Sequence, residues 1–107
     1  MTAPEDREDT AQSSILMDAD AAFRVSARRN RLLAHWAAEK MALTPEESDA
    51  YSKAVIQSDF EGAGDEDVIR KVLGDLVAAG CDVDQAGVRA ALEEKAVEAR
   101  RQLMGES

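Results

Sequence analysis

The sequence predicts an all-α protein, a small antiparallel four-helix bundle with a long first helix and a flexible N-terminal arm. Its 107 residues suffice for one domain with a single modest core. Alanine is abundant and β-branched residues are scarce, which favours helices over strands. Apolar residues recur at helical spacing in four segments, and short turn-forming stretches separate these segments. We expect residues 1–20 to form the mobile arm and residues 21–107 to form the bundle.

The first predicted helix follows a polar N-terminal stretch. The first dozen residues are charged and nearly lack large apolar side chains, so we expect them to be disordered in isolation. From about Ser14 to Leu43 the chain contains neither Gly nor Pro, which predicts one long helix. Apolar residues recur along it at roughly helical spacing, at Phe23, Ala27, Leu33, Trp36, Ala37 and Met41.

The second helix has the clearest start signal, the sequence LTPEE at residues 43–47. Thr44 can act as the N-cap, Pro45 suits the first helical position, and Glu47 completes a capping box. We expect this helix to run to about Phe60. Its predicted inner face carries Tyr51, Ala54, Val55 and Ser58.

The third and fourth helices are delimited by acidic caps and glycines. Asp65 is the predicted N-cap of the third helix, and Gly80 is the left-handed residue that ends it. Asp84 is the predicted cap of the fourth helix, which Gly105 closes. The predicted buried positions are Ile69, Val72, Leu73 and Leu76 in the third helix and Val88, Leu92, Ala96, Ala99 and Leu103 in the fourth.

One stretch of this acidic protein has a net positive charge. The net charge is −9 overall, yet residues 23–40 carry five bases against one acid. The flanks, with net charges of −5 over residues 1–22 and −8 over residues 41–107, would repel phosphates, so we expect no nucleic-acid partner. The arginines of this stretch form either a solvated helix face with weak ion pairs or a protein-binding surface, since Arg and Trp often anchor interfaces.

The composition indicates a cytoplasmic protein. The single Cys81 excludes an intramolecular disulfide and suits a reducing compartment. The N-terminal residues lack the apolar region of a secretion signal, and no apolar run approaches the length of a membrane span. We therefore expect no direct membrane insertion.

No group of residues indicates catalysis or a metal site. His35 is the only histidine, with no set of Cys, Asp or Glu at ligand spacing around it, so we expect a structural histidine, half-buried or at the surface. Cys81 has no identifiable base and is expected to be unreactive. The segment from Asp82 to Glu93 resembles a calcium loop, but Ala86 stands where an oxygen ligand is needed. We predict that the protein is not an enzyme.

Residues 23–43, FRVSARRNRLLAHWAAEKMAL, and residues 59–72, DFEGAGDEDVIRKV, resemble the ζ subunit family of α-proteobacterial F-type ATP synthases. The similarity covers nearly the whole chain. The residues that carry it are Phe23, Ala27 to Asn30, Leu32, Leu33, Trp36 to Lys40, Asp59, Phe60, Gly64, Glu66 to Val68 and Arg70 to Val72. The resemblance implies a four-helix bundle preceded by a mobile inhibitory segment.

The resemblance also implies an inhibitor of ATP hydrolysis, similar in function to the mitochondrial ATPase inhibitor protein. The N-terminal segment becomes helical as it enters a catalytic interface between α and β subunits and contacts the central γ subunit. The implied partners are the α, β and γ subunits of the synthase head, with the protein cytoplasmic, peripheral to the membrane-bound synthase and monomeric when free. The residues expected to contact these partners are Asp6, Arg7, Glu8, Ile15, Leu16, Asp18, Phe23, Arg28, Arg29 and Arg31.

Part of the arm departs from the family pattern. After an Asp-Arg-Glu that matches residues 6–8, the family usually has an aromatic, an acid, a small residue, a lysine and a second aromatic. This chain has Ala11, Gln12, Ser13, Ser14 and Ile15 at those positions. The departure leaves a second interpretation open, a non-inhibitory relative that acts as a nucleotide-binding or assembly module. The resemblance requires no cofactor, and it raises ATP or ADP binding on the bundle without a motif to locate the site.

Overall fold

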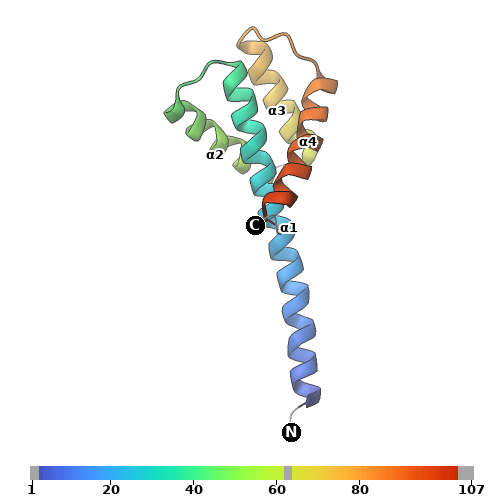
Figure 1. The fold of residues 1–107 in the computed structure, drawn as a ribbon. Helices are drawn as coiled ribbons and strands as arrows, with labels where there is room; N and C mark the ends of the chain where they lie inside the picture. The colour runs from blue at the N-terminus through green and yellow to red at the C-terminus, as the bar shows by residue number, and fades with distance from the viewer. Residues whose placement is uncertain (1–2, 62–63, 104–107) are drawn as a thin grey trace.

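The computed structural model is built from α-helices (Figure 1). It describes the backbone of residues 3–61 and 64–103 and the side chains of residues 20–59 and 64–103. Within these residues the elements are α1 (Ala3–Lys40), α2 (Pro45–Glu61), α3 (Asp65–Ala78) and α4 (Gln85–Leu103), with no strand and no helix that could span a membrane. The predicted all-α fold class with a long first helix is confirmed. Gly105, the predicted end of the last helix, lies outside the described residues.

The other helices are arranged around α1. The C-terminal half of α1 packs against α2 on one side and α4 on the other, while α3 packs on α2 and α4 and contacts α1 less. Neighbouring helices run in opposite directions, and the N-terminal half of α1 projects away from the bundle (Figure 1). In the described part of the chain α2 and α4 do not pack against each other. One face of α1 therefore lies open between them.

The backbone of α1 begins at Ala3, well before the expected start near Ser14. Pro4 is tolerated because the first turn of a helix needs no backbone N–H from it. The residues that follow include Glu, Arg, Ala and Gln, all of which favour helices. The helix can therefore continue through this segment without a break. The expectation that residues 1–20 form a mobile arm stays a prediction.

α3 ends in the left-handed turn predicted at Gly80. The amide of Gly80 donates to the carbonyl of Val77 (2.9 Å), and the amide of Cys81 donates to the carbonyl of Leu76 (2.9 Å). These are the two bonds of a Schellman motif. Gly80 has a φ of 84°, a conformation that glycine adopts without steric cost because it has no Cβ.

α1 ends in the same motif with an alanine in the left-handed position. The amides of Ala42 and Leu43 donate to the carbonyls of Glu39 (3.1 Å) and Ala38 (3.0 Å), and Ala42 has a φ of 58°. The chain thus leaves the helix after Lys40, earlier than the expected end at Leu43. A residue with a Cβ in the left-handed region costs roughly 1–2 kcal/mol, so Ala42 adopts a conformation that alanine disfavours.

The starts of α2 and α4 are capped as predicted. The amide of Glu47 donates to the hydroxyl of Thr44 (3.1 Å), and the amide of Thr44 donates to the carboxylate of Glu47 (2.8 Å). The capping box is therefore complete. At α4 the amide of Gly87 donates to the carboxylate of Asp84 (2.9 Å), which satisfies one of the free donors of the first turn.

The prediction that Asp65 caps α3 is wrong. Asp65 is the first helical residue, and Gly64, with a φ of 113°, stands at the cap position without a side-chain hydrogen bond. The Asp65 carboxylate pairs with Arg29 of α1 instead (3.0 Å). The acidic first turn, residues 65–67, still favours a helix start because it complements the positive end of the helix dipole.

The core is made of small and medium-sized apolar side chains, of which Leu33, Ile69 and Leu76 are the largest that are fully buried. α1 contributes mainly alanines, which let the neighbouring helices approach it closely. The buried apolar residues are Leu33, Ala34, Ala37, Ala38, Val55, Val68, Ile69, Val72, Leu76, Val88, Ala91, Leu92 and Ala99.

The predicted inner faces agree best with α3 and α4 and least with α2. In α2 Ala54 is exposed, whereas Ser52 is buried and donates its hydroxyl to the carbonyl of Asp49 (2.8 Å). A hydroxyl that forms a hydrogen bond can lie in a core, so a serine can occupy this buried position of α2. Leu103 of α4, predicted to be buried, is 37% exposed, and Phe23 of α1, one of the helically spaced apolar residues, is 54% exposed.

Exchanging the left-handed residues at the two helix ends is expected to change stability in opposite directions. Ala42→Gly should raise the free energy of unfolding by about 0.5–1 kcal/mol, because loss of Cβ strain outweighs the extra entropy that glycine loses on folding. Gly80→Ala should lower it by about 1 kcal/mol; nothing lies within 4 Å of the added Cβ, so the change reports backbone strain alone. Urea unfolding measures both variants, and a destabilised Ala42→Gly variant would contradict the account.

Candidate functional site

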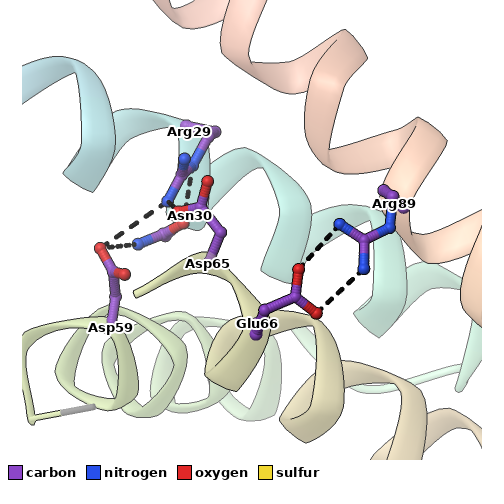
Figure 2. Close-up of polar contacts among 6 residues, drawn as sticks. All are labelled: Arg29, Asn30, Asp59, Asp65, Glu66 and Arg89. Carbon is purple, nitrogen blue, oxygen red and sulfur yellow. Dashed lines mark hydrogen bonds and ion pairs between the residues drawn. The ribbon is translucent and has the colours of Figure 1, made fainter. Parts of the chain in front are cut away.

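A network of polar side chains joins three helices where α1 leaves the bundle (Figure 2). The Asn30 amide donates to the Asp59 carboxylate (2.9 Å), and the Asn30 side-chain oxygen accepts from Arg29 (3.0 Å). The Arg29 guanidinium also pairs with Asp65 at 3.0 Å and lies 3.7 Å from Asp59. The network therefore ties α1 to the end of α2 and to the start of α3.

Asn30 is buried, with 1% of its surface exposed. By helical spacing it extends the buried stripe of Leu33, Ala34 and Ala37 by one turn. A buried amide without partners would cost about 1–3 kcal/mol, but here the side chain both donates and accepts. Among the described side chains no buried polar atom lacks a partner.

Arg29 is the least exposed of the charged residues in this network. Its side chain is 11% exposed, against 21% for Asp59 and 57% for Asp65. A charge at this depth is tolerated when it is paired and hydrogen-bonded, and removing its partners is costly. The guanidinium presents five N–H donors in a fixed plane, so one side chain can reach Asn30 and the carboxylates of two helices.

A second link joins α3 to α4. Two nitrogens of Arg89 each donate to one oxygen of Glu66, both at 2.9 Å (Figure 2). These hydrogen bonds are the main cause that lowers the pKa of Glu66 below its ordinary value, and they raise the pKa of Arg89. Because the pair is exposed, it adds more to the relative orientation of the helices than to stability.

Grooves flank α1 beside the network. One of about 290 Å³ lies between α1 and α2 and reaches Asn30 and Asp59. Another of about 500 Å³ lies between α1 and α4, with Arg29 and Arg100 among its lining residues. The side chains of α1 along this stretch are mostly small and leave this space open: Ala21, Ala22, Ser26 and Ala27.

The structure gives the predicted partner-binding arginines different surroundings. Arg29 is engaged in the network, Arg28 donates to Gln102 of α4 (3.1 Å), and Arg31 is exposed. Phe23 lies with Arg28 and Arg31 in one groove. The remaining predicted residues have side chains outside the described ones: Asp6, Arg7, Glu8, Ile15, Leu16 and Asp18.

Other polar groups of the bundle have structural partners. His35, half-buried, shares a hydrogen bond with Ser48 (2.8 Å), and the Cys81 thiol donates to a carbonyl in the last turn of α1 (3.3 Å). The Tyr51 hydroxyl donates to Asp75 (2.8 Å); burial, and then this carboxylate, raise the pKa of the phenol. Within the described residues no group of three or more His, Cys, Asp or Glu side chains could hold a metal ion.

Sequence reasoning did not identify the role of Asn30 or its partners. A signal was present for Asn30, a polar residue in register with an apolar helical stripe. Asp59 lies 29 residues away, and no local pattern distinguishes it from the other exposed acids of the chain. The pair becomes visible only when α1 and α2 are packed together.

Comparisons with known proteins agree with this architecture. A family model described as ATPase inhibitor subunit zeta matches residues 1–102. A protein with a solution NMR structure is 45% identical and has a TM-score of 0.68, with 79% of this chain and 96% of that chain covered. No curated protein sequence matches. The family match spans the arm, the polar network and nearly all of α4.

Asn30→Ala is expected to lower the free energy of unfolding by about 2 kcal/mol, because it removes the hydrogen bonds that Asn30 makes to Asp59 and to Arg29 in a buried setting. Ser52→Ala is the matched control, since Ser52 is also buried but bonds only to the backbone of its own helix. It should cost less than about 0.5 kcal/mol. Urea denaturation measures the free energy of unfolding of both variants. Equal losses would show that the network stabilises the fold no more than a hydrogen bond within one helix does.

The pKa of Glu66 is expected to lie below its ordinary value of 4.5 and to return towards it in Arg89→Gln. The folded chain holds the Glu66 proton more weakly than the unfolded chain. The pair therefore contributes stability above pH 4.5, and this contribution is lost as the pH falls through the lowered pKa. NMR titration of the carboxyl carbon measures both proteins. A Glu66 pKa that Arg89→Gln leaves unchanged would refute the link between α3 and α4.

Proposed function

The chain belongs to the ATPase inhibitor subunit zeta family, and from this premise we propose that it regulates an F-type ATP synthase by blocking ATP hydrolysis. The N-terminal arm would insert at a catalytic interface between α and β subunits of the head and reach the central γ subunit. The observation that carries the proposal is the continuity of α1, one helix from Ala3 to Lys40 whose C-terminal half is packed into the bundle.

This continuity has an energetic consequence for binding. An isolated helix must first form a costly nucleus, whereas an existing helix grows by one hydrogen bond for each residue added. The bundle half of α1 supplies such a nucleus for the arm, because it is held in the bundle by the buried side chains of Asn30, Leu33, Ala34, Ala37 and Ala38. A partner that binds the arm as a helix therefore has to meet only the cost of ordering the residues that it covers.

An inhibitor of this kind needs no catalytic group. It acts by filling an interface whose subunits have to move during hydrolysis, so steric occupancy and affinity are sufficient. We accordingly propose that the protein is not an enzyme, that it is monomeric when free, and that it works in the cytoplasm at the periphery of the membrane-bound synthase.

The sequence of the arm favours a second candidate function. At residues 11, 14 and 15 this chain has Ala, Ser and Ile where the usual family pattern has an aromatic, a lysine and a second aromatic. Buried aromatics are among the residues that contribute most to protein interfaces. A chain with the family bundle but a weakened arm would bind the head, or a nucleotide such as ATP or ADP, without stopping hydrolysis.

ATP hydrolysis by the purified cognate synthase head should fall when the full-length protein is added to saturation. Deletion of residues 1–17 should abolish the effect, because it removes the inserting arm and leaves the bundle in place. Thermal unfolding of the truncated protein is the control that its bundle is intact. Co-sedimentation with the head measures binding in the same samples.

The outcomes separate the two candidates. Inhibition by the full-length protein alone supports the inhibitor. Co-sedimentation without inhibition, at concentrations where all sites are filled, contradicts the inhibitor and supports the assembly or nucleotide-binding module. Inhibition that survives removal of residues 1–17 would show that the arm is not the inhibitory element.

A further inference from the structure

The face of α1 between α2 and α4 carries a groove of about 270 Å³ that includes exposed apolar surface. Phe23 and Leu103, which are 54% and 37% exposed, line it together with Ile56 of α2 and Ala27 of α1. The groove is open because α2 and α4 do not contact each other within the described residues. It falls below the roughly 300–1,000 Å³ that is usual for small-molecule sites, so its size suits the side chains of a docked protein segment.

The same groove carries positive charge with little compensation. Its three arginines are spaced by four and three residues and so share one face of α1. Arg24 pairs with Asp20 (2.9 Å), but Arg28 bonds the neutral Gln102 (3.1 Å), and Arg31 forms no ion pair with any described side chain. Guanidinium groups that have no ion pair with a described carboxylate and lie beside apolar surface favour a partner that carries carboxylates.

We propose that this groove docks an acidic, partly apolar segment of the ATP synthase head, as a second attachment point beside the arm. The inference rests on the proposed function. The groove begins at Phe23, immediately after the arm, so a head held by the arm lies next to it. Two linked contacts reinforce each other because the first brings the second to a high effective concentration. Arginine and aromatic side chains are the residue types that most often anchor such contacts.

Charge argues against other occupants. A second copy of the chain in a two-fold contact would place Arg28 and Arg31 opposite themselves, and like charges at an interface repel. A nucleic acid would meet the net charge of −9 of the whole chain. An acidic segment of the head that covers only the groove meets its arginines and, unlike a long nucleic acid, does not extend over the acidic remainder of the chain.

Arg31→Glu tests whether the groove binds the head, because the Arg31 side chain has no ion pair within the described residues that the change would remove. Arg70→Glu is the control for net charge, an exposed arginine of α3 outside the groove; it gives the same change in net charge and breaks only an exposed ion pair with Asp67 (2.8 Å). Association of each full-length chain with the cognate head is measured at low and physiological salt. We expect Arg31→Glu to slow association about tenfold at low salt, with a smaller loss at higher salt, and Arg70→Glu to stay close to wild type.

A photoreactive residue at position 31 identifies the occupant. Cross-links in the complex should map to a segment of the head rich in Asp and Glu. Cross-links to a second copy of this chain, or to a basic segment, would overturn the proposal, as would equal association rates for the two charge-reversal variants. If the wild-type chain does not bind the head at all, the proposed function itself fails, which is a different result from binding that ignores position 31.

Discussion

Burial of the Asn30 amide is the constraint on which the arrangement of the helices depends. An amide in the core has to be hydrogen-bonded, and the Asp59 carboxylate at the end of α2 supplies the partner. This contact fixes α2 against α1 and places Asp59 beside Arg29, which in turn holds Asp65 at the start of α3. The Glu66–Arg89 pair then connects α3 to α4. A series of polar contacts thus orients helices whose small apolar side chains pack with little directional preference.

Neighbouring helices cover α1 on the C-terminal side of this network and leave it partly exposed on the N-terminal side. From Leu33 to Ala38, α1 is enclosed by neighbouring helices, and its alanines allow close packing. From Ala21 to Arg31 its small residues lie beside grooves, and the side chains of Phe23, Arg24 and Arg31 are exposed. The surface available to a partner therefore lies where the arm leaves the bundle. An anchored arm and an accessible surface next to it are what a regulatory subunit needs in order to hold a larger complex.

The features predicted correctly from the sequence are those that depend on neighbouring residues. The Thr44 capping box, the Gly80 turn and the stripe of α3 need only contacts within a few residues, and each is present in the structure. The left-handed turn at Ala42 was missed because alanine disfavours the conformation that it adopts there. The role of Arg29 was missed because Asp59 and Asp65 reach it only after α2 and α3 have packed onto α1. Long-range pairing of charges leaves no periodic signal in one sequence.

We propose that α1 is one helix with one half fixed in the bundle and another half that its partner orders. Amide hydrogen exchange along α1, measured with and without the cognate ATP synthase head, tests this most directly. We predict slow exchange over residues 30–38 in both states, and exchange over residues 3–20 that is fast in the free chain and slow in the complex. Residues 3–20 that exchange equally fast in both states, in a complex shown to be saturated, would contradict the account.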